Sequence, residues 1–202
     1  MIIIRLSLGA VLLIFAAACS KNGASQPETP SKPIAIADSF ASPIGKKESI
    51  TQAKDSDEWY NALDFGTDNH LGEDWNKNTG GNTDCGEPVY AIGNGVVTYA
   101  TDAGPGWGNV IIVTHTLPDG SNVQSLYGHL REILKASGQV KKREQIGKVG
   151  NANGKYLCHL HLELRDQNCP SWDMVFVGYS PIRYGWLDPS DFIDEQRRKH
   201  DR

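Results

Sequence analysis

The chain has 202 residues, of which 22% are charged, and its formal net charge at pH 7 is −4. Binding of nucleic-acid phosphates needs a basic face that this composition does not supply, which argues against a nucleic-acid partner. The length suits one domain with a single core, and we expect no second domain.

The N-terminus has the pattern of an export signal. Arg5 is followed by an uncharged apolar run over residues 6–18, which is shorter than the roughly 20 residues that a spanning helix needs. The run ends in small residues before Cys19 (AAAC), and this stretch resembles a bacterial lipoprotein signal. The resemblance implies that residues 1–18 are removed and that Cys19 carries a lipid anchor in the cell envelope, facing the periplasm. A plain cleaved signal is the alternative, because Ala16 stands where such signals usually have leucine.

Residues 19–57 are expected to form the anchor and a disordered tether. They are rich in Pro, Ser, Lys and Ala and poor in aromatic residues, so they cannot bury enough surface to fold alone. As a flexible coil such a segment spans on the order of 35 Å. The folded domain is therefore expected at residues 58–202.

From about Trp59 onward, short β-rich runs alternate with turn signals such as GPGWGN and LPDGSN. No helix-length periodic segment lies between these runs, which favours antiparallel sheet over βαβ units. We predict one mainly β domain built on a central antiparallel β-sheet with a smaller β-hairpin layer. A short helix is expected only at the end, with Asp188 as N-cap and Pro189 in the first helical position. The runs are PVYA (88–91), GVVTYA (95–100), NVIIVTH (109–115), VQSLYGHL (123–130), QIGKVG (145–150), LHLEL (160–164) and MVFVGY (174–179).

Two histidines lie on one face of the strand expected at 160–164. Side chains two positions apart in a strand point to the same side, so His159 and His161 face one way while Cys158 and the leucines face the other. The leucine face is expected in the core, and the histidine face is expected to look into a cleft or solvent. Two imidazoles within about 7 Å can share one site as metal ligand and base. Two exposed histidines are the alternative.

A second group of metal-binding side chains lies upstream in DNHLGEDWN. His70 and Asp74 offer a nitrogen and an oxygen ligand of the kind that zinc takes, and Gly72 is expected to let the backbone turn sharply. Because Gly72 and NKNTGGN are poor helix formers, both residues are placed at a strand end that runs into a loop. With His161, the set contains two imidazoles and one carboxylate. It leaves a fourth tetrahedral position for water, which is the stoichiometry of a catalytic zinc site.

The segments HLGED, YGHL and HLHLE, in this order, resemble the zinc endopeptidases of the lysostaphin and LytM type, whose motifs are HxxxD, a lone histidine after a tyrosine strand, and HxH. The resemblance extends over about residues 66–166, most of the expected domain. It implies that Zn²⁺ is bound by His70, Asp74 and His161.

The same resemblance makes His129 and His159 the catalytic histidines that flank the metal and its water. We expect His159 to be the base, and His129 to orient the water or His159, or to stabilise the oxyanion. Tyr127, two residues before His129, is expected to line the substrate cleft, with ordinary strand packing as the alternative. Glu163 is placed at the cleft as well, as a partner that holds an imidazole tautomer or as an exposed strand residue. His115 is interpreted as structural.

With Cys19 lipidated, three cysteines are left in an oxidising compartment. We predict a bridge between Cys158 and Cys169, because a strand and its return would bring them together, with Cys85 as a rival partner for either. Cys158 also stands directly before His159, where the family usually has a small residue or proline. Residues 168–186 are longer than the ending expected after HxH, and we expect an extra hairpin there that shapes specificity.

The sequence thus predicts a lipid-anchored zinc endopeptidase that cuts peptide cross-links of bacterial peptidoglycan. Cross-links that contain D-amino acids are favoured over glycine bridges by analogy with the family. Two alternatives stay open: a non-enzymatic peptidoglycan binder or activator of other wall hydrolases, and a zinc protease that acts on proteins. A monomer is the default oligomeric state.

Overall fold

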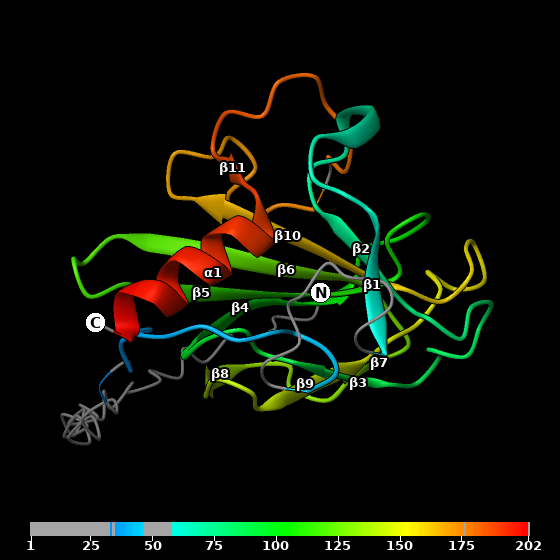
Figure 1. The fold of residues 1–202 in the computed structure, drawn as a ribbon, viewed down its shortest axis with the longest axis horizontal. Coiled ribbons are helices and arrows are strands. Elements are labelled where there is room, and N and C mark those ends of the chain that lie inside the picture. Colours follow the sequence, from blue (N-terminus) through cyan, green and yellow to red (C-terminus); the bar gives the residue numbers. More distant parts are fainter. Residues whose placement is uncertain (1–32, 34, 47–57, 176, 202) are drawn as a thin grey trace, which may run out of the picture. The chain divides into compact units, whose positions relative to one another are not determined.

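The computed structural model describes residues 33, 35–46, 58–175 and 177–201 (Figure 1). The expected signal at 1–18, Cys19, and the tether residues 20–32, 34 and 47–57 lie outside the described residues. Over the part of the chain that is described, no helix is long and apolar enough to cross a membrane.

Two antiparallel sheets form the domain, as predicted, and the strand pairs of the described residues all run antiparallel. The large sheet has the order β1 (Trp59–Leu63), β2 (Glu73–Lys77), β10 (Leu160–Asp166), β6 (Asn122–Leu130), β5 (Asn109–Thr116), β4 (Gly95–Asp102) and β8 (Gly138–Val140), with β11 (Trp186–Leu187) paired to β10. The small sheet has the order β3 (Pro88–Tyr90), β9 (Gln145–Lys148) and β7 (Glu132–Ile133). A 3₁₀ turn, η1 (Thr67–Asn69), and one helix, α1 (Pro189–His200), complete the set.

Both faces of the central strands are covered. In β5, Ile111 and Val113 belong to the main core, whereas Val110 and Ile112 pack in a second cluster on the opposite face. Val175 joins this second cluster from the segment after β10. A strand that is buried on both faces reads as a continuous apolar run, which explains the pattern NVIIVTH.

The leucines of β10 lie in the main core, as predicted. The opposite face is open only near the histidines, because Glu163 and Arg165 are fully buried. The Arg165 guanidinium donates to the backbone oxygens of Ser171 and Met174, so the segment after β10 covers this face. The expectation that the whole face looks into a cleft or solvent is therefore wrong beyond His161.

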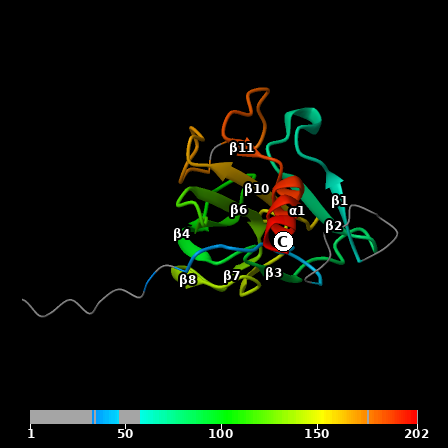
Figure 2. The same cartoon turned by 60° about the vertical axis from the view of Figure 1, so that its left-hand side comes forward.

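The C-terminal helix α1 begins as predicted. The side chain of Asp188 caps it by accepting a hydrogen bond from the backbone N–H of Asp191, and Pro189 occupies the first turn. Ile193 is buried against the large sheet, and α1 lies across one face of that sheet (Figures 1 and 2).

The expected disordered tether is wrong for residues 35–46, which pack on the domain as a strap. Phe40 and Ile44 are buried, and the Phe40 ring meets the rings of Phe192 and His115 edge-on. The backbone N–H groups of Ala37 and Ala41 donate to carbonyl oxygens at the ends of the sheet. Figures 1 and 2 show this blue segment running between α1 and the small sheet. The few apolar residues in 35–46 suffice because the domain supplies the partner surface.

The predicted bridge between Cys158 and Cys169 is also wrong: Cys158 is bonded to Cys85, and Cys169 is a free, buried thiol. Cys158 precedes β10 and Cys169 follows it, so an extended strand of seven residues, about 23 Å long, keeps them apart. Because β2 is antiparallel to β10, the end of β2 lies beside the start of β10, and the loop after β2 brings Cys85 to Cys158.

The run MVFVGY is not a strand over its described residues, and the described residues of 168–185 contain turns, bends and one isolated bridge where an extra hairpin was expected. This segment does touch the site, because Tyr179 forms a β-bridge with His70. The strand β1 and the extent of β2 were missed because WYNAL and EDWNK lack a clear apolar alternation.

Candidate metal centre and cleft

The candidate ligands come together where β2, β10 and the end of β6 lie side by side. Asp74 of β2 stands directly opposite His161 of β10, and Gly128 of β6 faces His161 from the other side. His70 lies just before β2, where its bridge to Tyr179 holds the backbone. The expected strand end thus holds for Asp74, the second residue of β2, whereas His70 lies before the strand.

Three donor atoms of these side chains converge on one point. His161 Nδ1 lies 2.9 Å from Asp74 Oδ1 and 3.0 Å from His70 Nε2, and the third separation, His70 Nε2 to Asp74 Oδ1, is 3.4 Å. With Zn–N and Zn–O bonds of about 2.0–2.1 Å, the edge of a tetrahedron is about 3.3 Å long. The set therefore fits a tetrahedral zinc ion that has one free position.

Gly72 is required here for close approach, not for the sharp turn that was expected. A Cβ at this position would lie 2.4 Å from the backbone oxygen of Leu162 and 2.9 Å from Cε1 of His161. Any larger residue would push β2 away from β10, and this would separate Asp74 from His161.

Without a metal, the groups around the site keep Asp74 ionised and His161 protonated. Burial alone would raise the pKa of Asp74, but hydrogen bonds with His161 and His70 outweigh it and hold that pKa well below its usual value. For His161, burial works against protonation, yet hydrogen bonds to Asp74 and Glu163 raise its pKa to about 9. A metal must therefore displace a proton from His161, so metal binding is expected to weaken as the pH falls.

Glu163 does not line the cleft but lies behind His161. Its Oε1 accepts from His161 Nε2 at 3.1 Å, which leaves Nδ1 to face the candidate metal position. Its Oε2 accepts from Trp186 Nε1 at 3.1 Å and from Arg165 Nε at 3.0 Å. The structure thus places Glu163 as the residue that fixes the orientation of an imidazole, and the cleft position is wrong.

Tyr127 is also absent from the cleft. Its side chain is fully buried in the main core, and its hydroxyl accepts from the backbone N–H of Ile92 and from Ser125 Oγ. The reason is a β-bulge in β6: two residues, Gly128 and His129, stand opposite one residue of β5. His129 has φ 63°, so its ring turns away from the side that Tyr127 occupies.

The two remaining histidines of the motifs are held by backbone carbonyl oxygens. His159 Nδ1 lies 2.9 Å from the oxygen of Leu157, and His129 Nδ1 lies 3.2 Å from that of Trp107. Because a carbonyl oxygen can only accept, both rings carry their proton on Nδ1 and leave Nε2 as an acceptor. The His159 Nε2 lies 3.7 Å from Asp74 Oδ1, and burial, followed by the nearby His161, lowers the pKa of His129 to about 3.

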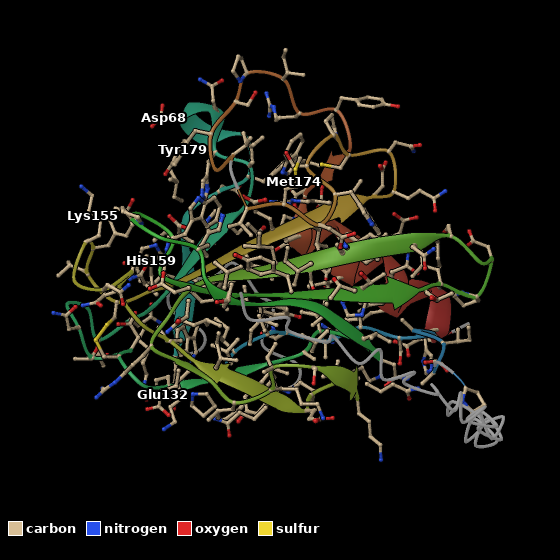
Figure 3. The ribbon with its side chains drawn as sticks, turned by 180° about the vertical axis from the view of Figure 1, so that it is seen from behind. Asp68, Glu132, Lys155, His159, Met174 and Tyr179 are labelled. Atoms are coloured by element: carbon tan, nitrogen blue, oxygen red, sulfur yellow. A yellow bond between two sulfur atoms is a disulfide. The ribbon has the colours of Figure 1, made fainter. Side chains whose placement is uncertain are left out.

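A cavity of about 240 Å³ opens over these groups. Asp74 and three of the histidines, His129, His159 and His161, line it together with aromatic side chains. Figure 3 shows His159 and Tyr179 at the same end of the domain. The other lining residues are Pro105, Gly106, Trp107, Tyr156, Gly178 and Tyr179.

The aromatic residues of this cavity were missed from the sequence. Trp107 lies in the turn GPGWG, which was interpreted only as a turn, and Tyr156 lies three residues before His159. The closeness of Tyr156 to His159 in the sequence is a signal that would have found Tyr156, whereas only the fold brings Trp107 to His129. Tyr179 has no such signal, because only the fold of residues 168–186 brings it to His70. His115 is structural as expected, buried and bonded to Asn94 O and Ser125 Oγ.

Comparisons with known proteins agree with this site. The model of peptidase family M23 matches residues 69–172, which contain His70, Asp74, His129, His159 and His161. The DD-carboxypeptidase/endopeptidase Mpg of Neisseria meningitidis is 36% identical over 85 residues, which are 42% of this chain and 19% of that protein. The chain thus spans about a fifth of the length of that relative.

Two further likenesses differ in what they cover. Lipoprotein NlpD of Yersinia enterocolitica is 35% identical over 81 residues, which are 40% of this chain and 78% of that protein. One chain of a crystallised complex of SpoIIIAH and SpoIIQ has a TM-score of 0.51 at 21% identity, covering 76% of this chain and 99% of the other. The second likeness concerns the fold alone. Because the family model covers more than half of the sequence, the chain belongs to peptidase family M23, and the predicted family is confirmed.

Proposed function

We propose that this protein is a zinc-dependent endopeptidase that hydrolyses peptide cross-links of bacterial peptidoglycan. The observation that supports it best is the convergence of His70 Nε2, Asp74 Oδ1 and His161 Nδ1 within 3.4 Å of one another, beside a cavity floored by two further imidazoles. Two imidazoles, one carboxylate and a free position are the donor set of catalytic zinc sites, whereas structural zinc sites are closed by four protein ligands.

In this proposal His70, Asp74 and His161 hold the ion, and Glu163 fixes the ring of His161. When bound, zinc supplies a Lewis acid that polarises the scissile carbonyl and lowers the pKa of a water molecule to about 7. The chain itself orients the peptide, accepts the proton and returns it to the leaving amine.

His159 is proposed as the proton acceptor. Its Nδ1–H is held by the oxygen of Leu157, so the basic Nε2 faces the cavity near Asp74. His129 stays neutral at pH 7 because burial lowers its pKa, and its Nε2 is available to accept a hydrogen bond from the attacking water. In this proposal His159 transfers the proton and His129 orients the water.

An extended substrate suits the surface around the cavity. A second hollow of about 400 Å³ shares Pro105 and Gly106 with its lining and is lined by Lys155 as well. The name of the Neisseria relative, a DD-carboxypeptidase/endopeptidase, supports cross-links that contain D-amino acids as the substrate.

The names of other relatives support the proposed location. Lipoprotein NlpD and its homologue in Pseudomonas aeruginosa, Lipoprotein NlpD/LppB homolog, are named as lipoproteins. We therefore propose that Cys19 is lipidated and that the domain works in the cell envelope, facing the periplasm.

The test is digestion of purified peptidoglycan by residues 20–202, with mass spectrometry of the released fragments. We expect cross-linked fragments to disappear, chelation to stop the reaction and zinc to restore it, and the new termini to identify the bond. A folded, zinc-loaded domain that binds peptidoglycan without cutting it would favour the binder or activator instead. Cleavage of unfolded proteins but not of peptidoglycan would favour a general protease.

A further inference from the structure

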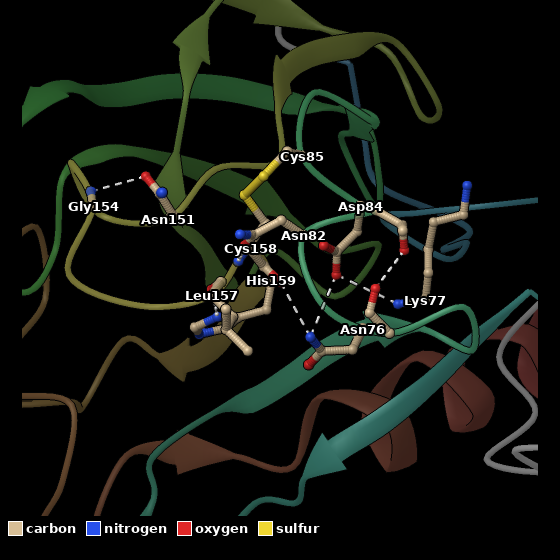
Figure 4. The surroundings of a disulfide bond; sticks show 12 residues. Asn76, Lys77, Asn82, Asp84, Cys85, Asn151, Gly154, Leu157, Cys158 and His159 are labelled. Atoms are coloured by element: carbon tan, nitrogen blue, oxygen red, sulfur yellow. Dashed lines mark hydrogen bonds between the residues drawn. A yellow bond between two sulfur atoms is a disulfide. The ribbon is translucent and has the colours of Figure 1, made fainter.

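Cys158, the residue directly before His159, is held at three points (Figure 4). Its sulfur is bonded to Cys85, its backbone N–H donates to Asn82 Oδ1 at 2.9 Å, and its carbonyl oxygen accepts from Asn76 Nδ2 at 3.1 Å. All three partners come from β2 and the loop that follows it, so this region fixes the peptide units on both sides of Cys158.

The first of these two peptide units, formed by the Leu157 carbonyl and the Cys158 N–H, carries the group that orients His159. The oxygen of Leu157 accepts from His159 Nδ1 at 2.9 Å, so the direction of the imidazole depends on where this carbonyl lies. The side chain of Leu157 is 61% exposed, and residues 153–156 are exposed as well. Their side chains therefore give Leu157 little packing. Its carbonyl is held through the peptide unit that it shares with the Cys158 N–H, and the next backbone N–H, that of His159, donates to the oxygen of Gly150 at 3.1 Å.

The candidate zinc ligands are held independently of this bond. Asp74 and His161 face each other across the β2–β10 ladder, and His161 is fixed further by Glu163. His70 is held by its bridge to Tyr179. Opening the disulfide is thus expected to loosen the carbonyl that aims His159 while leaving the three metal-binding groups in place.

We propose that the Cys85–Cys158 disulfide is a positioning device for His159, which sets the direction of its Nε2 through the carbonyl of Leu157. Because Cys85 lies in the loop after β2, a covalent bond to that loop restrains the backbone directly before the histidine. The inference rests on the proposed function, because it takes His159 as the proton acceptor. It makes turnover, but not zinc binding, dependent on the oxidised state of the pair.

The test compares Cys85→Ala/Cys158→Ala with a matched control, both in a Cys169→Ala background so that no free thiol exchanges. The control keeps the disulfide. We measure kcat and KM on a purified cross-linked peptide dimer, and zinc affinity by competition with a chromophoric chelator. A displacement of about 1 Å can lower turnover roughly a hundredfold, so kcat is expected to fall ten- to a hundredfold, with KM and zinc affinity changed less than about threefold.

Reduction of the control variant gives a second route to the same comparison. Two thiols of dithiothreitol supply two electrons and two protons, which convert the disulfide into two cysteine thiols and the reagent into its cyclic disulfide. We expect kcat to fall on reduction and to recover on reoxidation. The Cys85→Ala/Cys158→Ala variant serves as the control for the reagent's effect on zinc, because its own activity should not respond.

Two variants of Asn82 keep the inference testable if the double mutant does not fold. Asn82→Ala removes the acceptor of the Cys158 N–H and should lower kcat, whereas Asn82→Asp keeps an acceptor oxygen and should restore it. A folded variant that lacks the disulfide and keeps its kcat overturns the inference. A parallel loss of kcat and zinc affinity also overturns it, because it would show that the disulfide only stabilises the fold. An inactive control variant instead contradicts the proposed function.

Discussion

Replacement of Glu163 by glutamine is expected to damage both the stability of the domain and its affinity for zinc. Glu163 and Arg165 are each 0% exposed, and Glu163 is the carboxylate that faces the Arg165 guanidinium. Glutamine keeps the shape of Glu163 but removes its charge, so Arg165 is left as a buried cation without its counter-charge. The same change takes a charged acceptor away from His161 Nε2.

The two effects have different magnitudes. Removal of one partner from a buried ion pair costs about 3–5 kcal/mol of unfolding free energy. Loss of the carboxylate that orients a metal-binding histidine typically lowers metal affinity by about 10- to 100-fold. Stability is therefore measured by urea unfolding with chelator present, because bound zinc would add its own stabilisation. Zinc affinity is measured by chelator competition.

A double variant separates the two roles. In Glu163→Met/Arg165→Met the buried pair becomes apolar, and such replacements are often neutral for stability. We expect most of the lost unfolding free energy to return, while zinc affinity stays 10- to 100-fold below that of the wild type, because His161 still lacks its acceptor. Zinc affinity of the double variant within about twofold of wild type would refute the assigned role of Glu163.

Three further predictions test the fold around the site. Phe40→Ala should cost about 3–5 kcal/mol in urea unfolding, whereas Ile36→Ala, at a side chain that is 45% exposed, should change little; equal effects would contradict the docked strap. Burial lowers the pKa of His115 to about 4, below the unfolded value of 6.5, so the unfolded state binds more protons between these values. The unfolding free energy should fall by about 3 kcal/mol as the pH drops from 6.5 to 4, and a similar slope in His115→Gln would contradict this cause. Gly72→Ala should abolish tight zinc binding, because its Cβ would lie 2.4 Å from the oxygen of Leu162; unchanged affinity would show that the strands can shift without cost.

Part of the candidate site could be predicted from the sequence because Asp74 and His161 lie on regular strands. The spacing in HLHLE puts both histidines on one face of an extended chain, and antiparallel pairing then brings Asp74 opposite His161. The role of Glu163 as a partner of an imidazole follows from the same alternation, although its burial beneath the segment after β10 does not.

Other features depend on contacts that a single sequence does not reveal. Strand alternation predicts a shared face for Tyr127 and His129, and the bulge that separates them has no clear signal in YGHL. The strap at 35–46 has too little apolar surface to fold alone. It is ordered because the domain buries Phe40. The disulfide depends on which loop returns to the start of β10, and that is set by the order of strands in the sheet.

In the proposed function, one zinc ion held by His70, Asp74 and His161 makes this domain a peptidoglycan endopeptidase. A zinc titration tests this: the protein is stripped with chelator, zinc is added in known amounts, and hydrolysis of a purified cross-linked peptide dimer is followed. We expect activity to rise linearly and to level off at one zinc per chain, and Asp74→Ala to show neither tight binding nor activity. Full hydrolysis by the metal-free protein, or undiminished activity in Asp74→Ala, would contradict it.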